Sequence, residues 1–386
     1  MIVRDFRSYD VMAAPIQKLF SEVKLPNNLI SLGQGVPFFQ PPMEVVETFS
    51  SFARRKEGYL YSGDFGYEEV RLGMTKKCMR ENKYRPHPEN IMMTSGGNQA
   101  FMNALLSITN VGDSVVVVAP YYFNHVMAIQ LAGCIPVVVE VDAQSGYIPS
   151  VEQIQEKIND NTKAVVTVSP NNPSGAVYPQ DVIRQINELC AQEGIFHISD
   201  EVYEYFLFEG ATHVSPACFD KELDHTISLY SFSKAFSMSG YRIGFMVFPE
   251  SLSQEVLKIQ DTIGICAAGP SQWAALKAVG LGREYVEQFL PVMEESRTVF
   301  FEELSKIEEV SYARTKGGYY VFVQIETNKD IRFLVKELIE KYKVMVLPGD
   351  IFGVKCPSLR LSYGNVEAKS AVEGMKRLRR GLSELL

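Results

Sequence analysis

The sequence lacks an apolar run long enough to cross a membrane, and it lacks an excess of basic residues. Its 386 residues include 38 Lys and Arg against 46 Asp and Glu, so the formal net charge is −8 at pH 7. A nucleic-acid partner requires a basic face, and this charge balance argues against one. Arg4, Asp5 and Arg7 interrupt any signal-like start. We therefore expect a cytoplasmic protein that binds neither nucleic acid nor a membrane.

Patterns for disulfides and metal sites are missing as well. The six cysteines lie far apart without a C-x-x-C motif, and the five histidines show no metal-ligand spacing. We expect reduced, mostly buried thiols and no metal site. What is present describes an ordinary globular protein, with 46% hydrophobic and 22% charged residues. The length allows two or three domains with a large core.

A helical pattern runs from Tyr67 to Asn82, and from residue 91 onward short apolar runs alternate with helical patterns. The predicted elements include a strand at Ile91–Thr94, a helix at Phe123–Leu131, one long amphipathic helical stretch from about Arg283 to Ile307, and strands at Val344–Leu347 and Ser358–Ser362. Runs such as Val115–Val118 are apolar without interruption, which is typical of strands covered on both faces. The predicted fold class is therefore α/β, with a mostly parallel sheet in a large domain at residues 43–285. A second alternation near the C-terminus predicts a smaller α+β domain, formed by residues 286–386 together with an N-terminal arm, residues 1–42. The sequence shows no internal repeat and no low-complexity linker.

Lys234 lies between two apolar runs, in a stretch rich in small hydroxyl residues. A lysine held in partly dry surroundings loses its proton more easily and becomes a nucleophile that can form a Schiff base. Eight residues further on, Arg242 offers a guanidinium fork suited to a phosphate, and Ser231 and Ser233 add hydroxyl donors. A Schiff-base amine beside a phosphate site is what pyridoxal phosphate requires. Taken alone, these residues could equally be ordinary loop charges, because short motifs recur by chance.

Further candidates also follow apolar runs, which is where a doubly wound sheet binds its ligands. The turn Gly96–Asn98 opens a helix whose free N–H groups could hold a phosphate. Tyr122 could stack on a flat ring, and Asp200 could pair with a pyridinium nitrogen. Asn172 and Tyr203 could donate to the phenolic oxygen of that ring. Singly, Asp200 could be a helix N-cap, Asn172 a turn residue and the glycines a tight turn. Together, at consecutive strand ends, they indicate one site.

The motifs resemble those of the fold-type-I pyridoxal-phosphate enzymes, and within them the class I/II aminotransferases of the aspartate aminotransferase superfamily. The resemblance covers nearly the whole chain in order. It is carried by Ser169–Gly175 (SPNNPSG), Ser199–Tyr203 (SDEVY), Ser231–Gly244 (SFSKAFSMSGYRIG) and Arg360–Ser362. It implies the pyridoxal-phosphate-dependent transferase fold, pyridoxal phosphate as the cofactor, and transfer of an amino group between an L-amino acid and a 2-oxo acid. It also implies a homodimer with shared active sites.

The resemblance further implies a role for each candidate residue. Lys234 would form the Schiff base and move a proton, with Asp200 and Tyr203 as the other catalytic residues. Tyr61 would reach the phosphate in the neighbouring subunit. The residues implied to bind the cofactor are Tyr61, Gly96, Gly97, Asn98, Tyr122, Asn172, Asp200, Tyr203, Ser231, Ser233, Lys234 and Arg242. Those implied to bind the substrate are Gly35, Val36, Tyr122, Asn172 and Arg360, of which Arg360 would grip the α-carboxylate.

Two departures from the family pattern leave the substrate open. Phe38 replaces an acidic residue of the arm, and Cys266–Gly269 replaces a stretch in which hydroxyl residues are common. No second arginine for a dicarboxylate is evident, so we expect an apolar or aromatic donor, or broad specificity. Another outcome on the same fold, by a C–S β-lyase, decarboxylase, cyclase or oxidase, stays an alternative because the pocket selects which bond breaks. An aminotransferase-like regulatory protein is less favoured, since no basic helix-turn-helix precedes residue 30.

Overall fold

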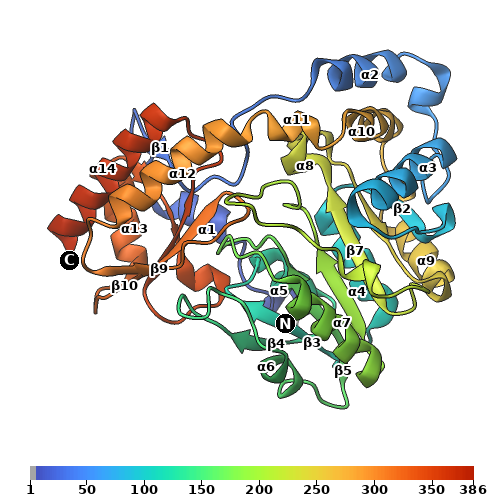
Figure 1. Ribbon diagram of the computed structural model, residues 1–386, viewed down its shortest axis with the longest axis horizontal. Coiled ribbons are helices and arrows are strands. Elements are labelled where there is room, and N and C mark those ends of the chain that lie inside the picture. Colours follow the sequence, from blue (N-terminus) through green and yellow to red (C-terminus); the bar gives the residue numbers. More distant parts are fainter. Residues whose placement is uncertain (1–5) are drawn as a thin grey trace, which may run out of the picture.

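The computed structural model describes residues 6–386, and a sheet of seven strands forms the centre of its larger part (Figure 1). In spatial order its strands are β2 (Ile91–Thr94), β8 (Gly244–Val247), β7 (Thr226–Ser231), β6 (Phe196–Asp200), β5 (Thr162–Val168), β3 (Ser114–Ala119) and β4 (Ile135–Glu140). β8 runs antiparallel to both of its neighbours, and all other pairs are parallel. The predicted mostly parallel α/β sheet is confirmed.

Helices cover both faces of this sheet, as uninterrupted Val and Ile runs require. Val115 and Val117 of β3 belong to a core cluster with side chains of α4, α5 and α9, whereas Val116 and Val118 belong to another with side chains of α6 and α7. Alternate residues of a strand point to opposite faces, so one strand contributes to two cores. The helices around the sheet are α4 (Gly97–Ile108), α5 (Phe123–Leu131), α6 (Val151–Gln155), α7 (Gln180–Glu193), α8 (Phe232–Ala235), α9 (Ser253–Gly264) and α10 (Gly269–Leu281).

Two helices that precede the sheet in sequence complete the larger part. α2 (Met43–Ala53) packs beside α10, and α3 (Glu68–Lys77) lies next to both α10 and β2. The predicted helix from Tyr67 to Asn82 ends as an α-helix at Lys77 and continues as a π-helical turn, Cys78–Asn82. Short 3₁₀ segments occur at Arg7–Tyr9, Lys56–Tyr59, Pro88–Asn90, Pro216–Cys218, Ser239–Tyr241, Glu250–Leu252 and Gly349–Phe352.

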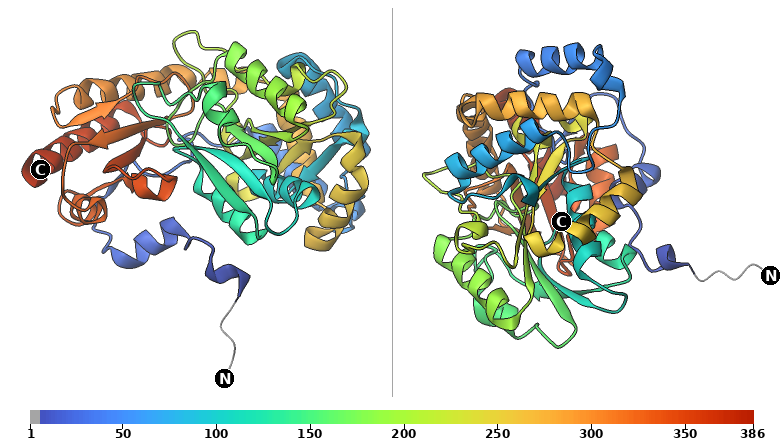
Figure 2. Two further views of the ribbon diagram at one scale, coloured as in Figure 1. Left: turned by 90° about the horizontal axis from the view of Figure 1, so that it is seen from below. Right: turned by 90° about the vertical axis from the view of Figure 1, so that its right-hand side faces the viewer.

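The C-terminal elements gather at one end of the molecule, away from the large sheet (Figures 1 and 2). Their antiparallel sheet has the order β12 (Leu347–Pro348), β13 (Ser358–Ser362), β10 (Tyr320–Ile325) and β9 (Val310–Tyr312). The helices of this end are α1 (Pro15–Glu22), α11 (Glu284–Glu287), α12 (Leu290–Leu304), α13 (Ile331–Glu340) and α14 (Ala368–Leu385). The N-terminal arm joins it through β1 (Ile30–Ser31), which pairs with β11 (Val344–Met345). The domain boundaries at residues 42 and 285 stay a prediction.

Two sequence expectations need correction in this C-terminal part. The long amphipathic stretch from Arg283 to Ile307 is two helices, because Pro291 at the second position of α12 favours a new helix start there. The single strand expected at Val344–Leu347 is two short strands that pair with different partners. Among the described residues, no helix is both long and apolar enough to span a membrane.

Candidate active site

The carboxyl ends of neighbouring strands bring the predicted site residues into one cavity of about 230 Å³. β7 is followed by α8 with Lys234, β6 ends at Asp200, and the loop after β5 carries Asn172. The cavity is lined by Ile16, Gly35, Gly97, Asn98, Tyr122, Phe123, Val168, Asn172, Asp200, Val202, Tyr203, Ser231, Ser233, Lys234, Ser239, Arg242, Tyr320 and Arg360. Twelve of these are residues that the sequence predicts for the site. Their convergence confirms that they share one place.

Lys234 lies in the middle of the cavity with its amine held by a main-chain carbonyl. Its Nζ donates a hydrogen bond to the carbonyl oxygen of Gly35, at 2.6 Å. Burial, and then the cations Arg360 and Arg242, lower the pKa of this amine to about 8, while Asp200 opposes them. A substantial fraction of the amine is therefore neutral near pH 8, as a nucleophile requires.

The N-terminus of α4 and Arg242 form a positively polarised end of the cavity. Gly97 and Asn98 are the first residues of α4, whose initial N–H groups have no partner within the helix. Gly96 precedes them with φ +84° and ψ 175°, a region that is open almost only to glycine. A Cβ at Gly96 would lie 2.6 Å from Nη2 of Arg242. The glycine thus lets the guanidinium approach the helix terminus.

Arg242 is held in this position by main-chain and hydroxyl oxygens. Its guanidinium donates to the carbonyls of Ser239 at 3.0 Å and Ser95 at 3.2 Å, and lies 3.5 Å from Oγ of Ser233. Its backbone is left-handed, with φ +48°, a conformation that is uncommon for a non-glycine residue. Ser231 Oγ accepts a hydrogen bond from the N–H of Ser233 at 3.2 Å. Cation, hydroxyls and helix N-terminus together suit a phosphate.

Asp200 lines the same cavity, and a histidine that the sequence analysis missed contacts it. His125 Nε2 is 3.1 Å from Oδ2 of Asp200, while Oδ1 accepts a hydrogen bond from the N–H of Val202 at 3.1 Å. The His125 ring stacks on Phe101 with ring centroids 4.2 Å apart. The imidazole therefore orients the carboxylate. Its position on α5, one turn after Tyr122, is the only sequence signal that could have indicated it.

Tyr122 contributes an aromatic side chain to the cavity wall. Its hydroxyl accepts a hydrogen bond from the Asn124 side chain at 2.8 Å, and its ring meets His125 edge to face. Burial, and then the Asp200 carboxylate, raise the pKa of this phenol to about 12. Tyr122 is thus neutral at physiological pH, and its flat face can stack on a ring.

Two tyrosines meet where the small sheet reaches the cavity. The hydroxyls of Tyr203 and Tyr320 are 2.8 Å apart, and burial raises the pKa of both phenols. The sequence analysis predicted Tyr203 but missed Tyr320, which stands at the start of β10 after two glycines. A chain separation of 117 residues hides this pair from any local pattern.

Arg360 enters the cavity from β13 and keeps part of its guanidinium unpaired. It is 3% exposed; it donates to Oδ1 of Asn172 at 3.0 Å and to the carbonyl of Gly33. Its guanidinium lies over the ring of Tyr320, 4.6 Å from the centroid. Its Nε is buried without a hydrogen-bond partner. A buried guanidinium with a free donor suits a carboxylate ligand.

Three predicted residues do not line this cavity. Val36, the chain neighbour of Gly35, is not part of the cavity wall. Gly96 is not part of it either, but it lies against the guanidinium of Arg242, which is. Tyr61 is 78% exposed, on the segment after α2. Its predicted role concerns the neighbouring subunit and stays a prediction.

The arrangement fits pyridoxal phosphate. The helix terminus with Arg242 would take the phosphate, Lys234 would lie within reach of the aldehyde, and Asp200 would face the ring nitrogen. The steric need for glycine at position 96 and the lowered pKa of Lys234 support this fit.

Comparisons with known proteins give a consistent family and a mixed substrate range. The family model for aminotransferase class I and II matches residues 27–378. The chain is 33% identical to a probable aspartate/prephenate aminotransferase of Aquifex aeolicus, over 93% of this chain and 92% of the relative. It is 32% identical to the aromatic aminotransferase ISS1 of Arabidopsis thaliana, over 97% and 94% of the two chains.

A solved structure has the same fold throughout. A single mutant of the aspartate aminotransferase of Thermus thermophilus superimposes with a TM-score of 0.91 at 28% identity, over 99% of this chain and all of that chain.

Proposed function

The chain belongs to the class I and II aminotransferases, and from this premise we propose that it moves an amino group between an L-amino acid with an apolar or aromatic side chain and a 2-oxo acid. The family uses pyridoxal phosphate, which supplies an electron sink for the carbanion formed at the substrate's α-carbon. The substrate preference and the residue roles below are proposals.

One observation supports the apolar preference most strongly. Among residues 6–386, the cations that line the cavity are Lys234, Arg242 and Arg360. Arg242 belongs to the phosphate end and Lys234 to the reacting centre, so only Arg360 is left for a substrate carboxylate. The same cavity wall also contains apolar and aromatic side chains, including Ile16, Tyr122, Phe123 and Tyr320. A second, side-chain carboxylate would be buried without a counter-charge, which is unfavourable.

Each of these cavity residues has a separate proposed role in the reaction. Asp200 would hold the ring nitrogen and keep it protonated, oriented by His125. Asn172 and Tyr203 would donate to the ring oxygen. Arg360 would bind the α-carboxylate through two parallel hydrogen bonds and fix the α-carbon above the ring. Lys234, with its lowered pKa, would take the proton from that α-carbon and deliver it to the C4′ carbon of the cofactor.

We also propose a homodimer in a reducing compartment such as the cytoplasm. Tyr59, Leu60 and Tyr61 are 72%, 52% and 78% exposed, in a continuous run. Burial of these side chains against a second copy would remove them from water, and would bring the Tyr61 hydroxyl to the neighbouring phosphate. All six cysteines lie in the described part of the chain, and no two of them are joined by a disulfide.

The half-reaction with a panel of amino acids tests the proposed function. Each amino acid is added alone to the enzyme loaded with pyridoxal phosphate, and the absorption change and the released products are measured. We expect conversion to the pyridoxamine form with one equivalent of 2-oxo acid, faster for phenylalanine, tyrosine or leucine than for aspartate. Faster conversion by aspartate would refute the preference, and release of ammonia, CO₂ or a thiol would instead indicate a lyase or decarboxylase.

A further inference from the structure

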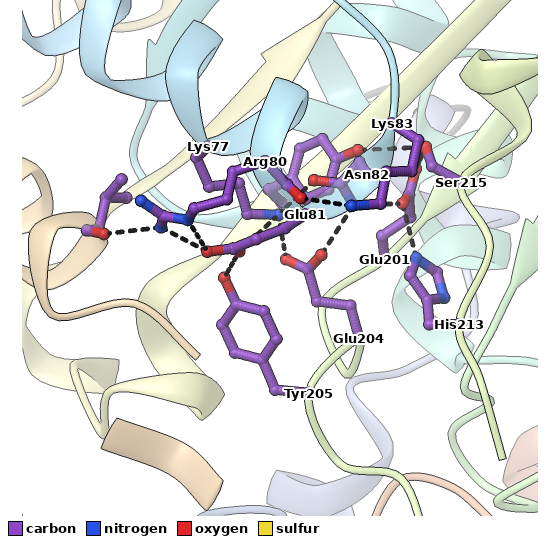
Figure 3. Close-up of polar contacts among 12 residues, drawn as sticks. Lys77, Arg80, Glu81, Asn82, Lys83, Glu201, Glu204, Tyr205, His213 and Ser215 are labelled. Carbon is purple, nitrogen blue, oxygen red and sulfur yellow. Dashed lines mark hydrogen bonds and ion pairs between the residues drawn. The ribbon is translucent and has the colours of Figure 1, made fainter. Parts of the chain in front are cut away.

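Glu201 and Glu204, in the Asp200–Tyr205 segment, belong to a buried polar network, and none of its residues lines the cavity (Figure 3). We call it the Lys77 network; it consists of Lys77, Asn82, Glu201, Glu204, His213 and Ser215. All are buried or nearly so; Glu201 is 0% and Lys77 3% exposed. Glutamates and lysines are seldom buried this completely unless they are paired.

The ammonium of Lys77 binds Glu204, one of the two glutamates of the network. Its Nζ is 2.5 Å from Oε1 of Glu204 and donates to Oδ1 of Asn82 at 2.8 Å. The Asn82 amide in turn donates to Oε2 of Glu204 at 2.9 Å and lies 3.5 Å from Oε2 of Glu201. Burial alone would lower the pKa of Lys77, but the carboxylates of Glu204 and Glu81 and the hydrogen bond to Glu204 reverse this and raise it. Lys77 is therefore a cation at neutral pH.

The other glutamate, Glu201, is bound by two residues of the loop that follows. Nε2 of His213 lies 2.8 Å from Oε2 of Glu201, and the Ser215 hydroxyl donates to Oε1 at 2.9 Å. The carboxylates of Glu201 and Glu204 and the His213 ring lie close enough to suggest a metal site, within 4.8 Å of one another. However, the Lys77 ammonium already occupies the place of a cation beside Glu204, so these contacts indicate a structural network.

The glutamates of this network alternate with the residues that face the cavity. Asp200 and Tyr203 line the cavity, whereas their neighbours Glu201 and Glu204 point into the network. A single backbone hydrogen bond, from the N–H of Glu204 to the carbonyl of Glu201 at 3.1 Å, closes the turn between them. Any shift of either glutamate is therefore transmitted to the neighbouring cavity residue.

The unusual end of α3 also serves this network. The π-helical turn Cys78–Asn82 widens the helix, and Lys83 leaves it with a left-handed backbone, φ +64°. π-turns inside helices occur frequently at functional sites. Here the turn places Lys77 and Asn82, five residues apart, on the same glutamate, Glu204.

We propose that Lys77 and Glu204 are positioning residues for the reaction: through the Lys77 network they fix the Asp200–Tyr203 segment against the cofactor ring. This inference rests on the proposed roles of Asp200 and Tyr203. The ion pair between Lys77 and Glu204, which lies outside the cavity, would then affect the cofactor as well as the stability of the protein.

The decisive variant is the double substitution Lys77→Met/Glu204→Gln. It removes one positive and one negative charge, so the net charge near the ring is unchanged and a spectral effect has to come from geometry. The measurement is the pH midpoint of the visible absorption band of the protein loaded with pyridoxal phosphate, together with the dissociation constant for the cofactor. We expect the midpoint to move by at least about half a pH unit and cofactor binding to weaken several-fold.

Two further variants separate the possible outcomes. Arg297→Met removes another fully buried cation, which pairs with Glu209 and Glu294 away from the cavity; it should lower the melting temperature and leave the midpoint in place. Asp200→Asn should move the midpoint if Asp200 has its proposed role. An unmoved midpoint in the double variant, with a moved one in Asp200→Asn, would overturn the inference. An unmoved midpoint in Asp200→Asn itself would overturn the role of Asp200 on which the inference rests.

Discussion

At the scale of single residues, the protonation of Lys234 sets the pH range in which the cofactor is captured. The pKa of its amine is lowered to about 8, from an ordinary value of 10.5. Below pH 8 the amine is mostly charged and unreactive, and above it the amine is neutral. We expect the rate of capture of pyridoxal phosphate by the apoenzyme to rise tenfold per pH unit below 8 and to level off above it.

Stopped-flow absorption of the apoenzyme mixed with pyridoxal phosphate measures this rate, with Nα-acetyl-lysine as the reference amine. The reference should continue to accelerate up to about pH 10.4. If the rate for the enzyme rose with pH as the rate for Nα-acetyl-lysine does, the lowered pKa of Lys234 would be refuted.

Arg360 is the residue to test for substrate recognition. Arg360→Lys keeps the charge but gives up the planar pair of hydrogen bonds to the α-carboxylate. A hydrogen bond to a charged group contributes about 1.5–3 kcal/mol, so we expect kcat/KM to fall by about ten- to a hundredfold. The loss should be uniform across amino acids, because all share the α-carboxylate, and cofactor affinity should hardly change.

Steady-state kinetics with the amino-acid panel measures this loss. Arg332→Lys, on the surface beside Asp350, is the matched control and should retain full activity. A loss confined to acidic substrates would show that Arg360 binds the side chain, and the proposed apolar preference would have to be withdrawn.

The residues found from sequence and those that were missed differ in a physical way. Lys234, Asp200 and Asn172 follow apolar strands directly, so the strand pattern predicts that they meet at one edge. His125 contacts Asp200 from a helix. Tyr320 contacts Tyr203 from the small sheet, 117 residues further along the chain. Such contacts depend on how the elements pack, which no local pattern records.

At the scale of elements, the turn between β2 and α4 allows a matched pair of substitutions. Gly96→Ala forces alanine into a glycine-only conformation and places its Cβ 2.6 Å from Arg242. Gly112→Ala also adds a side chain at positive φ, +93°, but into open space. We expect both to lower the free energy of unfolding by about 1–3 kcal/mol.

Only Gly96→Ala should also raise the dissociation constant for pyridoxal phosphate, since only it displaces the phosphate-binding guanidinium. Urea denaturation and cofactor titration measure the two quantities. Equal cofactor affinity in the two variants would contradict the proposed phosphate end of the cavity.

Element bounds were predictable where local signals coincide. The strands Ile91–Thr94 and Ser358–Ser362 and the helix Phe123–Leu131 have the bounds that the sequence predicts. The π-turn after α3 was not predictable, because Lys77 and Asn82 acquire their partners only when the chain after β6 packs against them. The break before α12 carried a signal in Pro291, which the amphipathic pattern obscured.

At the scale of the whole molecule, the exposed run Tyr59–Tyr61 bears on assembly. If a second subunit covers it, Tyr61→Phe removes a hydroxyl that would reach the partner's phosphate. The loss of one hydrogen bond of about 1.4 kcal/mol should raise the dissociation constant for pyridoxal phosphate about tenfold. Tyr9→Phe, at another exposed tyrosine, is the control and should have no effect.

Sedimentation and a mixing experiment test the shared site. Tyr61→Ala and Lys234→Ala subunits, each impaired alone, should regain activity when mixed, because one site of each hybrid dimer is then intact. A fully active monomer, or hybrids without recovered activity, would contradict shared active sites.

The central claim is that pyridoxal phosphate binds covalently at Lys234, in the cavity at the carboxyl ends of β5, β6 and β7. Reduction of the loaded enzyme with borohydride makes the lysine–cofactor bond permanent, and peptide mass spectrometry then locates it. We expect one pyridoxyl group per chain, on the peptide that contains Lys234. A stoichiometric label on any other lysine, or none on Lys234, would contradict it.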